Sequence, residues 1–157
     1  MPGSVLLAVD NSRNSQKAID YTCAHLGRDA AVTVFSVLPD VASACDMEDP
    51  SLVPIFKDNR QAFCTLEDAK KAAAKNFAEQ AKACLVSAGF PAKNVKLKVV
   101  KKKGDVAAQI ITEAQKGGHD TIVIGRRGLS GIKEFFLGSV SNKVVQAAQD
   151  VAVLVVG

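Results

Sequence analysis

The sequence contains no tryptophan, a single tyrosine and seven phenylalanines among its 157 residues. Proteins that bind single-stranded nucleic acids stack the bases on aromatic side chains, so this scarcity argues against that class. Basic residues do cluster, in the run Lys101-Lys102-Lys103 and the pair Arg126-Arg127, but no aromatic residue is interleaved with them. We therefore expect no nucleic-acid partner. The net charge of +4 either attracts phosphates or only solvates the surface.

Long hydrophobic runs are missing as well. No stretch approaches the roughly 20 apolar residues that a membrane helix needs. The chain passes from Met1 directly into an apolar run that ends at Asp10, without the basic leader of a secretory signal. These absences predict a soluble cytoplasmic protein with no membrane association.

The four cysteines are widely spaced and form no Cys-x-x-Cys pair, and no histidine is placed to complete a metal site with them. Cys23 and Cys84 fall on apolar positions of predicted helices. We interpret them as buried thiols in a reducing compartment, with a disulfide as the alternative.

Hydrophobic residues make up 48% of the chain and charged residues 23%, which is typical of a globular protein. With no internal repeat and no linker, residues 1–157 are predicted to form a single domain. Strand-like apolar runs alternate with helical periods along its whole length. The predicted strands are 5–10, 31–38, 94–100, 121–124 and 151–156, and the predicted helices are 14–26, 58–88, 105–116 and 139–148, with a long connection over 40–57. Asn14 and Asp105 are the predicted caps of their helices, and Leu66 is predicted on the apolar face of helix 58–88. This alternation predicts an α/β sandwich around a parallel sheet.

A stretch with regularly placed glycines runs from Gly125 to Ser141, between a predicted strand and a predicted helix. Gly125 and Gly128 would let the backbone turn tightly and approach an anion. Gly138 leads into a helix start, where unpaired amides and the positive end of the helix dipole attract phosphate. The predicted phosphate-binding groups are the amides of Ser139, Val140 and Ser141, the hydroxyls of the two serines, and the cations Arg126 and Arg127. The alternative is that Ser139 only caps the helix and the glycines only form a loop.

Two common phosphate-binding patterns are absent. The chain has neither the Gly-x4-Gly-Lys-Ser/Thr of a Walker A loop nor the Gly-x-Gly-x2-Gly of a dinucleotide-binding strand and helix. P-loop phosphoryl transfer and hydride transfer are therefore not expected.

The spacing Gly125-x2-Gly128-x9-Gly138-Ser139 resembles the ATP-binding signature of the universal stress protein family, and the likeness extends over residues 4–156. The resemblance implies a three-layer α/β sandwich of the adenine nucleotide alpha hydrolase-like kind, with a five-stranded parallel sheet of order 3-2-1-4-5. It also implies that ATP with Mg2+ binds where the strand order reverses, between strands one and four.

The same resemblance implies roles for individual residues. Asp10 would face the ribose or a phosphate-bound Mg2+, and the backbone near Val37 would face the adenine. Gly125 to Gly128 would contact the ribose and phosphates, and Gly138 to Ser141 the phosphates. Read from its position alone, Asp10 at the end of a buried strand either acts on a ligand or only caps its own loop.

The last predicted strand, 151–156, is apolar on both faces and lies at a sheet edge in the implied strand order. A long uncharged edge promotes aggregation unless it is covered. We expect a homodimer through this strand, as the family resemblance also implies, and the alternative is that the protein's own helices bury it.

These observations favour an ATP-binding regulatory or stress-response protein whose dimer is recognised by a protein partner that the sequence does not identify. No catalytic residue is predicted, because no general base or second acid accompanies Asp10. A slow ATPase on the same fold and an interaction module without nucleotide remain the alternatives.

Overall fold

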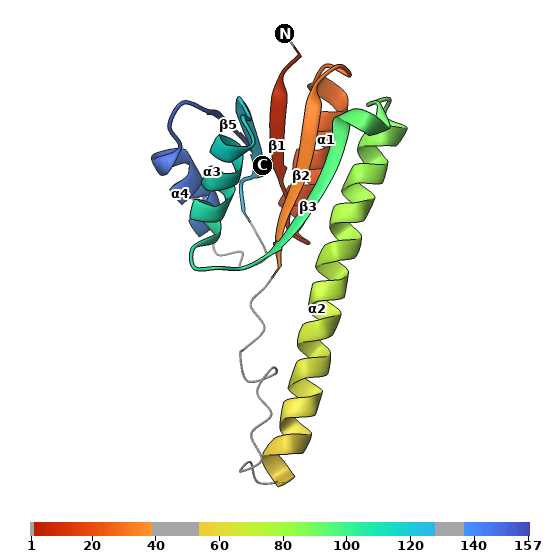
Figure 1. Ribbon diagram of the computed structural model, residues 1–157, viewed down its shortest axis with the longest axis vertical. Coiled ribbons are helices and arrows are strands. Elements are labelled where there is room, and N and C mark those ends of the chain that lie inside the picture. The colour runs from red at the N-terminus through yellow and green to blue at the C-terminus, as the bar shows by residue number, and fades with distance from the viewer. Residues whose placement is uncertain (1, 39–53, 128–136) are drawn as a thin grey trace.

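Five parallel strands form the central sheet of the computed structural model, which describes residues 2–38, 54–127 and 137–157, and of 54–65 and 67 only the helical backbone (Figure 1). The strand order is β3-β2-β1-β4-β5, so the predicted fold class and strand order are confirmed. The observed strands start and end within two residues of the predicted bounds. They are β1 (Ser4–Ala8), β2 (Ala31–Leu38), β3 (Val95–Lys101), β4 (Thr121–Gly125) and β5 (Ala152–Val156).

Helices cover both faces of the sheet and complete the three layers (Figure 1). α1 (Arg13–His25) and α2 (Pro54–Ser87) lie on one face, and α3 (Val106–Lys116) and α4 (Ser139–Ala147) on the other. Alternation along β1 creates the two cores, because successive side chains of a strand point to opposite faces. Val5 and Leu7 join the core under α1 and α2, whereas Leu6 and Ala8 join the core under α3 and α4.

The start of α1 differs from the prediction. Ser12, in an extended conformation, is the N-cap, and its Oγ accepts a hydrogen bond from the Ser15 amide at 3.2 Å. Asn14, the predicted cap, already lies inside the helix. Ser12 is as good a capping residue, so the choice between them depended on where the chain leaves β1. The predicted cap of α3 is confirmed, since Asp105 Oδ1 accepts from the Ala107 amide at 3.2 Å.

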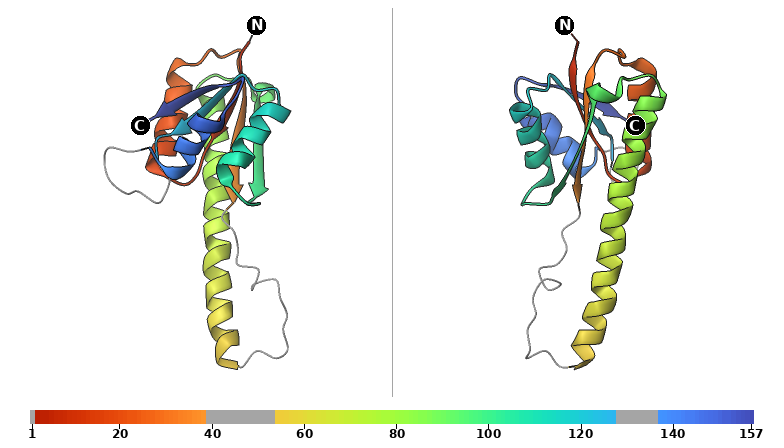
Figure 2. Two further views of the ribbon diagram at one scale, coloured as in Figure 1. Left: turned by 90° about the vertical axis from the view of Figure 1, so that its left-hand side faces the viewer. Right: turned by 45° about the vertical axis from the view of Figure 1, so that its right-hand side comes forward.

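α2 begins at Pro54, four residues before the predicted start at residue 58. Proline fits the first turn of a helix because the amide it lacks has no partner there. The amino-terminal half of α2 extends well past the sheet (Figure 2), and Leu66, predicted on the buried face, is 56% exposed. The rest of the predicted connection, residues 40–53, lies outside the described residues. None of the helices in the described ranges is long and apolar enough to cross a membrane.

Polar contacts tie β1 to the start of β4 at the amino end of the sheet. Asp120 Oδ2 accepts from the Ser4 amide at 2.8 Å, and Ser4 Oγ lies 2.9 Å from His119 Nδ1. The Ser4 amide and the Thr121 hydroxyl hold the pKa of Asp120 below its usual range, and burial lowers the pKa of His119. These contacts hold the amino ends of β1 and β4 together.

Candidate functional site

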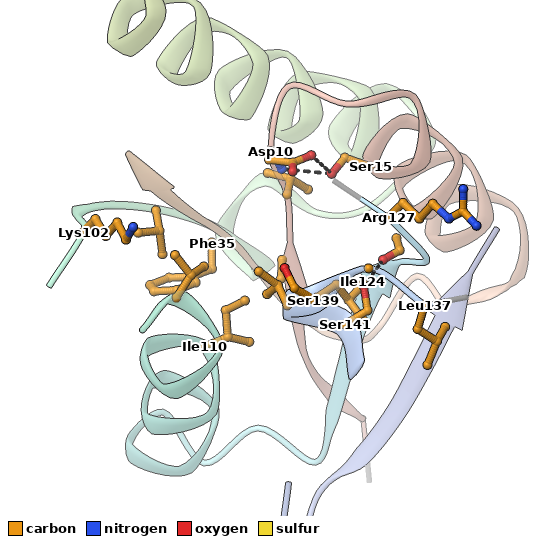
Figure 3. Close-up of a pocket in the computed structure, with 17 residues that line it drawn as sticks. Asp10, Ser15, Phe35, Lys102, Ile110, Ile124, Arg127, Leu137, Ser139 and Ser141 are labelled. Carbon is orange, nitrogen blue, oxygen red and sulfur yellow. Dashed lines mark hydrogen bonds between the residues drawn. The ribbon is translucent and has the colours of Figure 1, made fainter. Parts of the chain in front are cut away.

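A cavity of about 810 Å³ lies at the carboxyl ends of β1, β2 and β4, between the sheet and the starts of α3 and α4 (Figure 3). β1 sits between β2 and β4 in the sheet, so this is the point where the strand order reverses. Open α/β sheets bind their ligands at such a point. The fold alone therefore marks this cavity as the candidate site.

The structure brings most of the predicted site residues to this cavity. Those that line it are Asp10, Val37, Gly125, Arg127, Gly138, Ser139, Val140 and Ser141. Gly128 lies outside the described residues, and Arg126 is not among the lining residues.

Arg126 links β4 to its neighbours. Its amide donates to the Val156 carbonyl at 2.6 Å, and its carbonyl accepts from the Gly138 amide at 2.8 Å. Its side chain lies against Gly157, where an added Cβ would come within 2.7 Å of Arg126 Cδ. Successive side chains of an extended segment point in opposite directions, so Arg126 and Arg127 do not both enter the cavity. The structure thus places one cation of the pair at the site, not two.

Gly125 is required for a reason that the sequence did not show. A Cβ at this position would lie 2.7 Å from the backbone carbonyl group of Asn14, which is too close for any side chain. The glycine therefore lets the first turn of α1 pack directly on the end of β4. Gly125 also lines the cavity, so the predicted approach of its backbone to an anion stays a prediction.

Ser141 also differs from its predicted role. Its hydroxyl donates to the carbonyls of Gly125 at 2.8 Å and of Arg126 at 3.0 Å, and the residue is only 2% exposed. A hydroxyl has one hydrogen, so none is left for a phosphate oxygen. Ser141 therefore joins α4 to the end of β4, and it can reach a ligand only through its backbone amide.

The amino terminus of α4 faces the cavity. Gly138 is the N-cap and makes no side-chain capping bond, and the first turn carries no acidic residue. The first amide bonded within the helix is that of Asn142, which donates to the Gly138 carbonyl at 2.9 Å. The amides of Ser139, Val140 and Ser141 precede it and have no acceptor in the helix. This end of the helix can therefore receive an anion.

Asp10 is held in place on the opposite wall of the cavity. Ser15 Oγ donates to Asp10 Oδ1 at 2.8 Å and accepts from the Asp10 amide at 2.9 Å (Figure 3). The carboxylate thus closes its own loop, as one of the two alternatives predicted, and because it also lines the cavity, a role on a ligand stays a prediction. Sequence reasoning missed Ser15, because nothing in a spacing of five residues signals this contact.

The middle of the cavity is apolar. Its walls include Phe35 from β2, Ile124 from β4, and Val106 and Ile110 from α3. Lys102, just after β3, also lines it, on the side away from Arg127 (Figure 3). The apolar residues were predicted only as core positions, and Lys102 only as part of a basic run, because the sequence does not show which strand ends meet.

No group of three His, Cys, Asp or Glu side chains that could hold a metal ion exists in the described part of the chain. Of the cavity's described lining residues, Asp10 is the only carboxylate. A divalent cation at this site would need most of its ligands from phosphates and water.

The family model described as Universal stress protein family matches residues 1–157. Among curated proteins, the universal stress protein YxiE of Bacillus subtilis is 31% identical over an alignment of 158 positions. The alignment covers 93% of this chain and 93% of that protein.

Two solved structures illustrate the likeness of fold. The universal stress protein UspA from Lactobacillus plantarum has a TM-score of 0.70 and 23% identity, with 99% of this chain and 97% of that chain covered. The universal stress protein from Archaeoglobus fulgidus in complex with dAMP has a TM-score of 0.61 and 17% identity, with 100% and 98% covered.

We predict that Ser141→Ala destabilises the protein by about 1–3 kcal/mol, because it removes a buried donor from two carbonyls. Ser139→Ala is the matched control, since Ser139 is exposed two residues earlier in the same helix, and its effect should stay within about 0.5 kcal/mol. Urea denaturation of both variants measures the difference. Equal effects would show that the Ser141 hydroxyl does not hold α4 to β4.

Proposed function

Because the chain belongs to the universal stress protein family, we propose that its cavity binds ATP together with Mg2+ and that the protein acts as a nucleotide-dependent regulator. The nucleotide-bound form presents the surface that a downstream protein partner recognises. This role needs a binding site but no chemistry.

The start of α4 is the observation that carries the proposal. The amides of Ser139, Val140 and Ser141 lack acceptors in the helix, their helix end is positive, and all three residues line the cavity. Phosphate groups supply the acceptors and the negative charge that such a helix start attracts. Arg127, which also lines the cavity, adds a positive charge to its wall.

The apolar part of the cavity suits the base. A purine ring is flat and largely apolar on its faces, and Phe35, Val37 and Ile110 provide walls of the same character. A volume of about 810 Å³ is within the range of about 300–1,000 Å³ found for small-molecule sites. Asp10 is placed to accept from ribose hydroxyls or to approach Mg2+ carried by the phosphates.

The relative from Archaeoglobus fulgidus was solved with dAMP bound, so at least one protein of this fold holds an adenine nucleotide. That finding supports the choice of base. The number of phosphates is proposed from this chain's own residues, because a helix start with several unpaired amides and a nearby arginine favours a polyphosphate over a single phosphate.

A binding role is favoured over hydrolysis. Among the described residues that line the cavity there is no histidine and no carboxylate besides Asp10, whose Oδ1 already accepts from Ser15. Phosphoryl transfer to water needs a group that orients or deprotonates that water. We therefore propose that bound ATP persists, with slow hydrolysis at most.

We predict that Gly138→Val lowers the affinity for Mg-ATP at least about tenfold, because valine is a poor N-cap and adds a branched side chain to a residue that lines the cavity beside the phosphate-binding amides. Gly3→Val is the matched control. Gly3 lies at the other end of the sheet, and a Cβ there meets Asp120 Oδ2 at an ordinary 3.6 Å. Isothermal titration calorimetry measures affinity, and circular dichroism checks that both variants keep their helices.

Unchanged affinity in a folded Gly138→Val protein would show that the start of α4 does not bind the phosphates. A wild-type protein that neither retains nor binds a nucleotide would favour the interaction module instead. Steady release of ADP from the wild type would favour the ATPase.

We also propose that β5 pairs with its counterpart in a second copy of the chain. β5 has a neighbour only on its β4 side in the described sheet, and its residues after Ala152 are half-buried although the strand lies at an edge. A symmetric partner would pair its free backbone groups and cover the remaining apolar surface.

The dimer predicts a native mass of twice 16.5 kDa. Ala152→Lys should shift it toward the monomer, because Ala152 is exposed at the start of β5 and lysine at a strand edge opposes pairing. Val86→Lys, which adds the same charge on partly exposed α2, should leave the dimer intact. Light scattering after size exclusion measures the masses, and a monomeric wild type would contradict the proposal.

A further inference from the structure

Two cysteines from different helices lie side by side on the layer formed by α1 and α2. Cys23 Sγ and Cys84 Sγ are 3.9 Å apart. Both residues are half-buried free thiols that pack against the core beneath these helices. Cys23 lies in the last turn of α1 and Cys84 in the last turn of α2, so the pair joins the carboxyl ends of both helices.

Neighbouring contacts hold the chain segments that follow these two helices together. The Arg28 guanidinium lies over the Phe90 ring, 4.8 Å from its centre. Asn94 Nδ2 donates to the Asp29 carbonyl at 3.3 Å. Both contacts cross from the segment after α1 to the segment after α2. The two thiols are therefore kept near each other by the fold and do not meet by chance.

We propose that Cys23 and Cys84 form a modification site, at which a small disulfide such as oxidised glutathione converts the two thiols into a reversible bond between α1 and α2. A disulfide has its sulfurs about 2.05 Å apart. The sulfurs need to approach by slightly less than about 2 Å, which rotation of the two side chains on the helix ends can supply.

The reaction balances without any other reagent. The thiolate of one cysteine attacks a sulfur of the small disulfide and displaces one small thiol, which leaves a mixed disulfide on the protein. The other cysteine, as its thiolate, then attacks the protein sulfur of that mixed disulfide and displaces the second small thiol. The protein loses two hydrogen atoms, and one small disulfide is reduced to two thiols.

Electrostatics makes this reaction dependent on pH. Burial, followed by the neighbouring Cys84 sulfur and the Asp20 carboxylate, raises the pKa of the Cys23 thiol to about 11, while the Arg28 guanidinium opposes the shift. Only the thiolate attacks a disulfide, and Cys23 is protonated at neutral pH. Attack by Cys23 is therefore slow near neutral pH and accelerates as the pH rises toward the pKa of its thiol.

The bond would connect residues 61 positions apart and thus restrict the unfolded chain strongly. It would also leave the nucleotide cavity unchanged, because Asp10 and Ser15 contact each other at the opposite end of α1 from Cys23. Oxidation would stabilise the layer of α1 and α2 without blocking the site.

The test uses full-length, fully reduced protein treated with oxidised glutathione at several pH values. Peptide mapping by mass spectrometry without reductant should find Cys23 and Cys84 in one crosslinked pair. The crosslinking rate should rise by up to about tenfold per pH unit between about pH 7 and pH 9. The melting temperature should rise by about 5–15 °C and return to its starting value with a reductant.

Cysteine variants provide the controls. The double variant Cys45→Ser/Cys64→Ser should crosslink as the wild type does, whereas Cys23→Ser or Cys84→Ser should stop at the mixed disulfide with glutathione. A wild-type map that pairs either cysteine with Cys45 or Cys64, or that shows only mixed disulfides or unreacted thiols at both positions, would overturn the proposal. This map needs no variant, so the test holds even if a serine variant fails to fold.

Discussion

The junction between β4 and α4 is the constraint on which the candidate site depends. The Ser141 hydroxyl bonds the carbonyls of Gly125 and Arg126, and the Gly138 amide bonds the Arg126 carbonyl. These contacts fix the start of α4 against the last residues of β4, so the first-turn residues, whose amides lack acceptors in the helix, line the cavity. Without them the helix could turn away, and the cavity would lose its positive wall. The Ser141 hydroxyl, which was predicted to contact a phosphate, instead orients the helix whose start we propose as the phosphate site.

The opposite wall depends on close packing. Because Gly125 has no side chain, the first turn of α1 can pack on the end of β4, which brings Ser15 to Asp10. The site thus lies where three chain segments distant in sequence converge at the carboxyl ends of the strands. At the other end of the molecule, the Ser4 and Asp120 contact and the Cys23 and Cys84 pair hold the sheet and the helices together. The candidate site and these contacts therefore lie at opposite ends of the sheet.

Pattern was sufficient to predict the elements, because the apolar run of β1 and the helical spacing in α1, α3 and α4 reflect which side chains are buried. The glycine pattern predicted the part of the cavity that Gly125, Arg127 and the start of α4 line, but not its apolar walls. Three features could not be predicted. Asn14 and Ser12 are both good caps, so sequence did not decide between them. The hydrogen bonds of the Ser141 hydroxyl and the position of the Arg126 side chain depend on how β4, α4 and β5 pack together. Lys102 and Ser15 reach the cavity only through the packing of strand ends that are far apart along the chain.

The most direct test of the central claim follows the backbone amides of Ser139, Val140 and Ser141 by nuclear magnetic resonance during titration of the wild-type protein. The account predicts that Mg-ATP shifts these three amide signals strongly, whereas adenosine, which has no phosphate, shifts signals from the apolar walls such as Val37 and Ile110 and leaves the three amides nearly unchanged. Equal shifts with both ligands, or ATP-induced shifts confined to other parts of the chain, would contradict the claim that the start of α4 binds the phosphates.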